Sequence, residues 1–362
     1  MKTLPVSYTL ITGGAGFIGT NLASRLADQG EQVLVYDNLS RQGVERNLEW
    51  LLQRYPEQIT FWNADVRDAE RINEAVTKGA NAVFHLAAQV AVTTSLEDPV
   101  YDFEVNARGT LNVLEALRKM SSPPPLLYTS TNKVFGGFDS LKVLERETRY
   151  EPEDEIVLAN GIGEEWRTEF CSPYGCSKGA ADQYVLDYSR CYHLPAVVFR
   201  MSCIYGPHQY GNEDQGWVAH FVRQSLESQP ITFYGDGKQV RDALFVDDLV
   251  EAALLAVKNI EMVRGQAFNI GGGVANTTSL IELVDRIAEL QGQTPEIRKE
   301  AWRPSDQRYY VSNLNAFNSV TAWKPRVGLP EGLSRLHNWA IENRVRENRV
   351  LDHLGTDDQV VQ

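Results

Sequence analysis

A chain of 362 residues, 43% hydrophobic and 23% charged, has the composition of a soluble globular protein with one large domain or two of ordinary size. Its formal net charge of −13 argues against nucleic acid or an anionic membrane as a partner. The sequence has no apolar run of the roughly 20 residues that a membrane helix needs, no signal-peptide pattern and no paired cysteine spacing. We therefore expect a cytoplasmic protein with reduced thiols and no metal site.

Short apolar runs alternate with amphipathic stretches up to about residue 200, which is the pattern of βαβ units around a parallel sheet. Strands are expected at Ser7–Thr12, Gln32–Asp37, Ile59–Asn63, Ala82–Leu86, Leu126–Ser130 and Ala196–Arg200. Helices are expected at Ile18–Gln29, Asp68–Lys78, Val100–Lys119 and Gly175–Cys191. The predicted fold class is α/β, a Rossmann-type doubly wound parallel sheet.

The rhythm of the chain loosens after residue 200, where glycine and proline separate shorter elements. We predict a cofactor domain over residues 1–200 and a smaller C-terminal α/β substrate domain over residues 201–345, with segments of about 240–275 returning to the first domain. Residues 346–362 are interpreted as a polar tail. The long acidic stretch Phe138–Pro173 is expected to be a lid, because a loop of that length is usually a lid or disordered.

A glycine-spaced run directly follows the first expected strand and opens the first helix. Gly13, Gly16 and Gly19 have the spacing G-x-x-G-x-x-G. Glycines permit a tight turn and let a pyrophosphate approach the free N–H groups of the helix N-terminus. Alone this is weak evidence, because glycine-rich turns between a strand and a helix also occur for packing reasons. The residues after the second strand strengthen it.

Asp37 ends the second expected strand, where a carboxylate would hydrogen-bond the ribose hydroxyls of a dinucleotide and repel a 2′-phosphate. NAD is therefore favoured over NADP, although Arg41 lies close by. Asp65, after the third strand, is assigned to the adenine amine, and a helix N-cap is an equal alternative. His85 at a strand end is interpreted as a packed structural residue.

Tyr174 and Lys178 begin a stretch with good helical periodicity and lie one turn apart on the same face. A nearby ammonium and a positive nicotinamide ring favour the phenolate, so the pKa of the tyrosine should fall from its ordinary value of about 10. Tyr174 would then act as a general base on a substrate hydroxyl. Thr131, at the end of another strand, would hydrogen-bond the same hydroxyl. Tyr234 and Lys238 match the same pattern, but the residues between them indicate a turn.

Several short segments combine into one family pattern: Thr12–Gly19, His85–Ala88, Thr129–Thr131, Tyr174–Lys178 and Ile204–Pro207. In this combination the chain resembles the extended short-chain dehydrogenase/reductases, specifically their nucleotide-sugar epimerases and dehydratases. The resemblance spans nearly the whole chain and implies bound NAD, with a sugar nucleotide held between the two domains. It also implies a homodimer packed through the helices that follow Asn106 and Tyr174.

Narrower segments are similar to the CDP-tyvelose (CDP-paratose) 2-epimerase subgroup of that family. They are Ser130–Val134, Ser172–Tyr184, Asp214–Trp217, Gly237–Asp242 and Ser305–Arg308. Two positions depart from the wider family: Phe135 replaces a tyrosine, and Cys203 stands where most relatives have an asparagine at the sugar diphosphate. Contacts of the galactose epimerases therefore do not transfer simply.

The resemblance completes the set of expected site residues. Further cofactor contacts are assigned to Phe17, Ile18, Asn38, Val66, Leu86, Ala87, Ala88, Asn106 and Thr129. The substrate is assigned to Gln89, Asn132, Lys133, Cys203, Trp217, Arg241, Arg303 and Arg308. Guanidinium groups match phosphate oxygens, so the arginines are the candidates for the diphosphate. Each of them has about even odds of being only a surface ion-pair partner.

The resemblance implies epimerisation at C2 of a CDP-linked hexose or dideoxyhexose through a transient 2-keto sugar, with Tyr174 as the base. The motif residues alone fit a 4-epimerase of the UDP-galactose type equally well. A 4,6-dehydratase is disfavoured, because it needs carboxyl groups beside Thr131 and the chain has Asn132 and Lys133 there. A non-catalytic NAD-binding sensor on the same fold is a further alternative.

Overall fold

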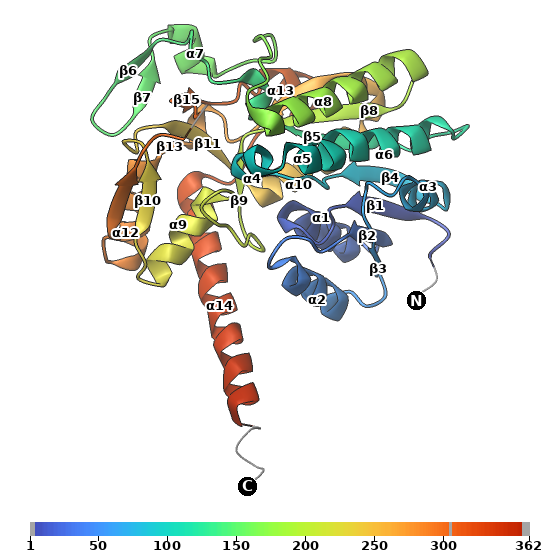
Figure 1. The fold of residues 1–362 in the computed structure, drawn as a ribbon, viewed down its shortest axis with the longest axis horizontal. Helices are drawn as coiled ribbons and strands as arrows, with labels where there is room; N and C mark the ends of the chain where they lie inside the picture. The colour runs from blue at the N-terminus through green and yellow to red at the C-terminus, as the bar shows by residue number, and fades with distance from the viewer. Residues whose placement is uncertain (1–3, 304–305, 357–362) are drawn as a thin grey trace.

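The computed structural model describes residues 4–303 and 306–356. A seven-stranded parallel sheet with the strand order β12-β8-β5-β4-β1-β2-β3 lies at its centre (Figure 1). Its strands are β1 (Tyr8–Thr12), β2 (Val33–Asp37), β3 (Ile59–Asn63), β4 (Ala80–His85), β5 (Leu126–Thr131), β8 (Ala196–Met201) and β12 (Ala267–Ile270). The predicted doubly wound fold is confirmed, and the expected strands match to within two residues.

Helices cover both faces of the sheet. One face carries α1 (Phe17–Asp28), α2 (Val44–Arg54), α10 (Val246–Lys258), α11 (Ile260–Val263) and α13 (Asn315–Thr321). The other carries α3 (Ala69–Thr77), α6 (Gly109–Arg118) and α8 (Ser172–Tyr192). Alternate strand residues face opposite sides, so Leu10 packs with the second set of helices and Ile11 with the first. This double burial explains why the strands are almost uniformly apolar.

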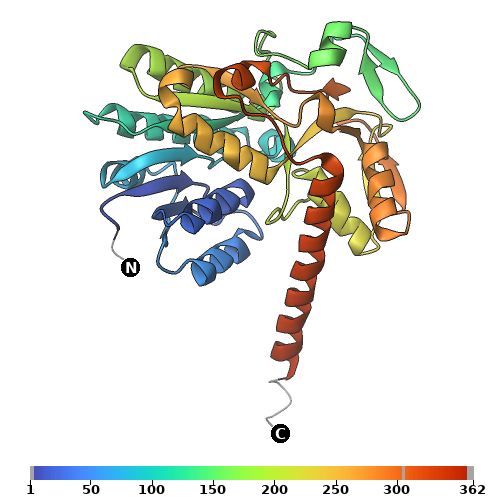
Figure 2. The same ribbon diagram turned by 180° about the vertical axis from the view of Figure 1, so that it is seen from behind.

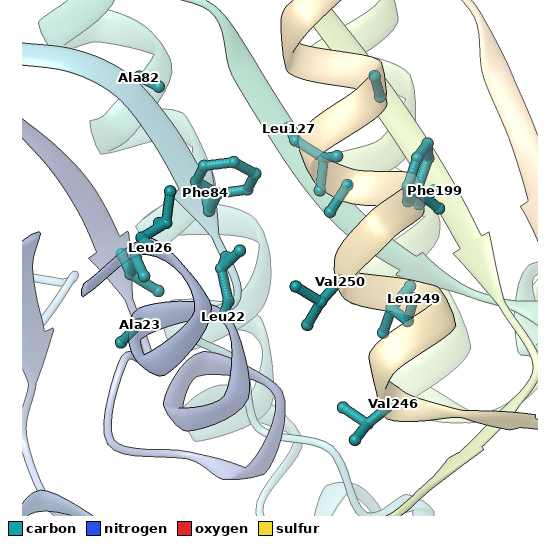
Figure 3. Packing of buried hydrophobic residues seen from close by; sticks show 14 of the residues in the cluster. Leu22, Ala23, Leu26, Ala82, Phe84, Leu127, Phe199, Val246, Leu249 and Val250 are labelled. Atoms are coloured by element: carbon teal, nitrogen blue, oxygen red, sulfur yellow. The ribbon is translucent and has the colours of Figure 1, made fainter. Parts of the chain in front are cut away.

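The core on the α1 face is built from segments far apart in the sequence. Leu22 and Leu26 of α1 lie opposite Val246 and Val250 of α10, and Phe84 and Leu127 of the strands belong to the same cluster (Figure 3). Residues beyond 240 thus pack against the first helix of the chain, and β12 extends the central sheet beside β8. The division of the chain into domains at residue 200 stays a prediction.

The expected helix Val100–Lys119 is interrupted. It consists of α5 (Pro99–Phe103), a π-helical turn η1 (Glu104–Arg108) and α6, and α4 (Val92–Glu97) precedes it. Asp98 caps α5 by accepting the Tyr101 N–H, and Pro99 occupies the first turn. A π-turn places an extra residue in the helix and is frequent at functional sites.

A smaller assembly follows β8 in the chain and lies beside the carboxyl edge of the sheet (Figure 2). One sheet of it contains β9 (Cys203–Tyr205), β11 (Val240–Phe245), β13 (Thr277–Ser279) and β15 (Tyr309–Tyr310). A parallel pair contains β10 (Ile231–Tyr234) and β14 (Ile297–Glu300). The associated helices are α9 (Trp217–Leu226), η3 (Val274–Asn276), α12 (Leu280–Gln291) and α14 (Leu329–Thr356).

The segment expected to be a lid has structure of its own. Its hairpin of β6 (Val143–Glu145) and β7 (Tyr150–Pro152) is followed by α7 (Glu155–Asn160). Arg149 Nε donates to Glu282 Oε1 at 2.7 Å, and the Tyr150 hydroxyl donates to Asp236 at 2.5 Å. These bonds attach the hairpin to the smaller assembly. A lid motion stays a prediction.

The expected polar tail begins inside a helix. α14 starts in the core of the smaller assembly, where Leu333 and Leu336 are buried, and it continues to Thr356 (Figure 1). The boundary predicted at residue 346 therefore does not coincide with the end of an element, because the helix continues past the residues that anchor it. Residues 357–362 of the predicted tail lie outside the described residues.

Candidate active site

One cavity of about 500 Å³ runs along the carboxyl ends of the central strands. Gly13 follows β1, Asp37 ends β2, Leu86 follows β4 and Thr131 ends β5, and all four line the cavity. This is the point at which the strand order reverses on either side of β1, where doubly wound sheets bind their ligands. The volume suits a small-molecule or cofactor site.

Most of the residues predicted for the site line this cavity. On the cofactor side they are Gly13, Gly16, Phe17, Ile18, Gly19, Asp37, Asn38, Arg41, Asp65, Val66, Leu86, Ala87, Ala88 and Thr129. Around the expected chemistry and substrate they are Thr131, Asn132, Lys133, Tyr174, Lys178, Cys203, Trp217, Arg241 and Arg303. The sequence therefore identified residues that the fold brings together from many elements.

The glycine run forms a cradle with no room for side chains. A Cβ added at Gly13, which has a φ of 71°, would lie 2.7 Å from the Ala87 nitrogen. A Cβ at Gly19 would lie 2.3 Å from the Gly13 carbonyl oxygen. Gly16 is the N-cap of α1 and supplies no capping side chain. The turn is thus open at a helix N-terminus, which fits the pyrophosphate of a dinucleotide.

Asp37 is fixed at the end of β2 by backbone donors. Its Oδ1 accepts the Leu39 N–H at 2.9 Å and its Oδ2 accepts the Ala15 N–H at 3.0 Å. Burial raises the pKa of Asp37, whereas these hydrogen bonds and the charge of Arg41 lower it. The carboxylate is accordingly held beside the glycine turn, where the ribose of a dinucleotide is expected.

Asp65 is not the N-cap of the following helix. Asp68 holds that position and accepts from the N–H groups of Glu70 and Arg71. Asp65 instead accepts from Asn38 Nδ2 at 2.8 Å and from the Arg67 N–H at 2.9 Å. Although burial raises the pKa of Asp65, hydrogen bonds from Arg67 and Asn38 hold it below its ordinary value. The alternative of an N-cap is therefore wrong.

Tyr174 and Lys178 project from the first turns of α8 into the cavity, and both are buried. Lys178 Nζ donates to the Thr129 carbonyl oxygen at 2.6 Å and lies 4.4 Å from the centre of the Tyr128 ring. Thr129 and Thr131 belong to β5, so the ammonium links the helix to the end of the strand. This link holds the side chain of Lys178.

Burial controls the ionisation of both groups. It raises the pKa of Tyr174 to about 12, while the Thr131 hydroxyl and the charge of Arg41 oppose this shift. It lowers the pKa of Lys178 to about 7, while Asp182 and Asp102 oppose the shift. The expected fall in the pKa of Tyr174 is therefore absent from the protein alone.

The polar side of the cavity holds Lys133, Arg241 and an acid that was not predicted. Asp306 accepts from Arg241 at 2.7 Å and lies 3.8 Å from Lys133 Nζ. Burial lowers the pKa of Lys133, and the charge of Asp306 counters this shift. Arg303 lies at the rim, 3.8 Å above the Tyr234 ring, and pairs with Asp214 at 3.1 Å. Cationic groups thus gather here in spite of the negative net charge.

Three predicted residues do not line the cavity. Gln89 Nε2 donates to Asp102 and to the Ala91 carbonyl oxygen, and Asn106 exchanges hydrogen bonds with Gln89 and donates to Ser177. Their polar atoms are therefore occupied by one another and by their neighbours, and the assignments of Gln89 to the substrate and of Asn106 to the cofactor stay predictions. Arg308 is exposed and lies 5.4 Å from the centre of the Tyr150 ring.

Arg308 differs in burial from the residue before it. The neighbouring Gln307 is buried, donates to the Gly136 carbonyl oxygen at 2.6 Å and accepts from Asn132 Nδ2 at 3.4 Å. Arg308, which directly precedes β15, is exposed and lies outside the cavity. The quoted segment Ser305–Arg308 contained both Asp306 and Gln307, but no spacing in the sequence distinguishes them from Arg308.

His85 is buried, with Nδ1 2.6 Å from the Thr12 hydroxyl and Nε2 3.0 Å from the Thr110 hydroxyl, so its structural role is confirmed. Within residues 4–303 and 306–356, no group of three or more His, Cys, Asp or Glu side chains is arranged to hold a metal ion. No helix in that part of the chain is long and apolar enough to cross a membrane.

Comparisons with known proteins agree with this geometry. The model of the NAD dependent epimerase/dehydratase family matches residues 9–271. The CDP-paratose 2-epimerase of Salmonella typhi is 42% identical over 336 residues, covering 91% of this chain and 98% of that protein. A putative UDP-glucose 4-epimerase of Methanocaldococcus jannaschii is 32% identical, covering 92% and 98%.

A solved structure extends the comparison to the cofactor. The UDP-glucose 4-epimerase of Thermus thermophilus, solved in complex with NAD, superposes with a TM-score of 0.76 at 31% sequence identity. The match covers 92% of this chain and 98% of that one. The glycine cradle and Asp37 are thus found in a fold shared with a protein solved with NAD.

Proposed function

This chain belongs to the NAD dependent epimerase/dehydratase family, and we propose that it inverts C2 of a CDP-linked hexose or dideoxyhexose. The observation that carries the proposal is the 42% identity, over nearly the full length of both chains, with a CDP-paratose 2-epimerase. The putative UDP-glucose 4-epimerase compared above is only 32% identical. The 2-epimerase-like segments Ser130–Val134 and Gly237–Asp242, which contain Lys133 and Arg241, contribute to the same cavity.

The chain is an NAD-dependent enzyme of this family. Bound NAD supplies the acceptor and donor of a hydride at the carbon that is inverted. We propose that the residues of the glycine cradle hold its pyrophosphate and that Asp37 holds a ribose hydroxyl. Asn38, Asp65 and Arg41 would surround the adenosine end, because all of them line the cavity near Asp37.

Tyr174 is the proposed acid and base. Its phenolate would take the proton of the C2 hydroxyl as the carbon is oxidised to a ketone, and the phenol would return a proton when the ketone is reduced on its other face. Lys178 would hold the phenolate by its charge, and Thr131 would hydrogen-bond the reacting oxygen. The contacts of Tyr174 with Thr131 and of Lys178 with Thr129 support these roles.

Arg241 and Lys133 are the proposed diphosphate and sugar contacts, with Arg303 at the rim. Guanidinium and ammonium groups in a buried pocket form strong charge-assisted hydrogen bonds with phosphate oxygens. The carboxylate of Asp306 accepts a hydrogen bond from Arg241 and lies near the ammonium of Lys133. Trp217 and Cys203, which lie beside them, would pack against the sugar nucleotide.

A 4,6-dehydration is less well supported, because Asn132 and Lys133 stand directly after Thr131 and provide no carboxylic acid. The main competing function is 4-epimerisation of a UDP-linked sugar, which would use Tyr174, Lys178 and Thr131 in the same way. The choice between them depends on the reacting carbon, so the test must label that carbon.

The purified protein should be assayed with CDP-paratose, CDP-tyvelose, UDP-glucose and UDP-galactose. Substrate deuterated at C2 should slow turnover and give a product that keeps its deuterium at C2, and heavy water should add none to carbon. Deuterium at C4 should have no effect. A primary isotope effect at C4, with a product inverted at C4, would replace this proposal by the 4-epimerase.

We also propose that the protein is a homodimer. Leu96, Val100, Phe103, Tyr184 and Tyr192 are exposed on the neighbouring helices α4, α5 and α8. Exposed apolar side chains on adjacent elements are a feature of surfaces that bind another protein. Sedimentation equilibrium should give twice the mass of the chain, and Val100→Glu should halve it.

A further inference from the structure

Asp102 is a buried carboxylate behind the cavity, in the last turn of α5 before the π-turn η1. Its Oδ1 accepts from Gln89 Nε2 at 2.8 Å and from Asn106 Nδ2 at 3.1 Å. Ser177 Oγ donates to Oδ2. A buried carboxylate is costly unless donors surround it. Burial raises the pKa of Asp102, and the hydrogen bonds from Ser177 and Gln89 and the charge of Lys178 oppose this shift. None of the roles proposed above uses this residue.

The bonds of Asp102 connect two parts of the site. Gln89 follows the cavity wall formed by Leu86, Ala87 and Ala88, and it is held to Asn106 through its own N–H at 2.9 Å. Ser177 lies between the two candidate catalytic residues on α8, and its hydroxyl is also 3.2 Å from the Tyr174 carbonyl oxygen. The carboxylate therefore links this wall to the first turn of α8.

The negative charge of Asp102 also raises the pKa of Lys178. The other negative group near Lys178 is Asp182, but both of its oxygens are paired with Arg200 at 2.9 Å and 3.0 Å. The groups that donate to Asp102 are neutral amides and a hydroxyl. Asp182 has the larger effect on the pKa of Lys178, and the charge of Asp102 adds to it.

The other groups that interact electrostatically with Tyr174 or Lys178 come from several elements. They are Arg41 after β2, His85 on β4, Tyr128 on β5 and Asp182 on α8. His85 is buried, and burial lowers its pKa to about 3, so it stays neutral at ordinary pH. Tyr128 is buried and its pKa is raised, so it stays neutral as well.

We propose that Asp102 is a positioning residue that aligns the start of α8 with the cavity wall and places a negative charge beside Lys178. This inference rests on the roles proposed for Tyr174 and Lys178. The charge opposes the loss of the Lys178 proton in a buried site, and it also opposes ionisation of Tyr174. Asp102 thereby favours a charged Lys178 and a neutral Tyr174 until the cofactor binds.

Asp102→Asn tests the charge with little change of shape. The amide oxygen can keep the bonds from Gln89 and Asn106, and the amide nitrogen can donate to Ser177, whose hydroxyl still reaches the Tyr174 carbonyl oxygen. Removing the negative charge lowers the pKa of both Tyr174 and Lys178. Both limbs of the profile of kcat/KM against pH should therefore move to lower pH, by roughly one unit.

Asp248→Asn is the matched control. Asp248 is also buried, and one of its oxygens accepts from the N–H groups of Arg326 and Val327, so an amide oxygen can replace it. It does not line the cavity. This variant should leave the pH profile in place. Ser177→Ala keeps the Asp102 charge and removes the link to α8, so it should lower kcat without moving the profile to lower pH.

A second measurement needs no turnover. The ultraviolet titration of the NAD-bound protein minus that of its Tyr174→Phe variant gives the ionisation of Tyr174, and Asp102→Asn should move it to lower pH. If Asp102→Asn shows this shift but the unmodified protein does not epimerise its substrate at C2, the proposed function is wrong and the role of Asp102 stands. If the titration of Tyr174 and the pH profile of kcat/KM are the same in Asp102→Asn as in the unmodified protein, the inference is wrong, whatever the rate of the variant.

Discussion

The indole N–H of Trp217 donates to Sγ of Cys203 at 3.2 Å, and both residues line the cavity. Cys203 follows the central sheet in β9, whereas Trp217 begins α9. Burial raises the pKa of the Cys203 thiol, although Arg241 and Trp217 oppose the shift. The thiol at this position is therefore held in its neutral form.

Cys203 should resist alkylation at neutral pH, because the thiolate is the reactive form and burial disfavours it. Iodoacetamide applied to the folded protein should label the exposed Cys191 and spare Cys203, as read by mass spectrometry of tryptic peptides. Unfolding in guanidinium chloride should make both equally reactive. Equal labelling of the two cysteines in the folded protein would contradict this packing.

Tyr174→Phe should lower kcat by about a hundredfold to ten-thousandfold, the usual cost of losing a general base. The ring still packs in its buried position, so the melting temperature and the amount of bound NAD should stay near those of the unmodified protein. Turnover within a fewfold of the original, at normal NAD content, would show that another group accepts the proton.

Much of the sheet could be predicted, because its strands are local apolar runs separated by turns. Ile59–Asn63 matches β3 residue for residue. The helix α2 was not predicted, and its start explains why. It begins after Gly43, whose φ is 89°, with no capping side chain, so the usual signal of a helix N-terminus is missing from the sequence.

In the candidate site, too, some residues could be predicted from local patterns and others could not. The glycine run and Tyr174 with Lys178 are local patterns, and their positions in the cavity follow from the fold class. Asn132 and Gln307, by contrast, are 175 residues apart and meet only through tertiary packing. The link between Asp102 and Ser177 likewise joins two helices. Contacts of this kind have no spacing that a single sequence can reveal.

Gly19→Ala should abolish NAD binding, because its Cβ would meet the Gly13 carbonyl oxygen at 2.3 Å and backbone atoms cannot move aside as a side chain does. The matched control is Gly328→Ala, where the nearest atom is 3.8 Å from the added Cβ. Calorimetric titration with NAD should give no heat for the first variant and an unchanged affinity for the second. Normal binding by Gly19→Ala would contradict the cradle.

Arg241→Gln and Arg308→Gln should behave differently. Arg241 is buried in the cavity, so loss of its charge-assisted bond to a diphosphate should raise KM by about tenfold to a hundredfold, with a smaller change in kcat. Arg308 is exposed and outside the cavity, so its variant should keep KM within about twofold, the expected scatter for a surface change. A large rise in KM for Arg308→Gln would restore the original assignment of that residue.

Arg200 and Asp182 form the buried ion pair that joins β8 to α8, with side chains 7% and 1% exposed. Asp182→Ala leaves the guanidinium of Arg200 without its partner, and removing one member of a buried pair typically costs about 3–5 kcal/mol in the free energy of unfolding. Urea denaturation should report a loss of that size. The double variant Asp182→Ala with Arg200→Met should recover part of it, because no charge is then left buried. If the single variant loses less than about 1 kcal/mol, as an exposed pair would, the pair does not hold α8 in place, and the catalytic helix must depend on Lys178 and Ser177 instead.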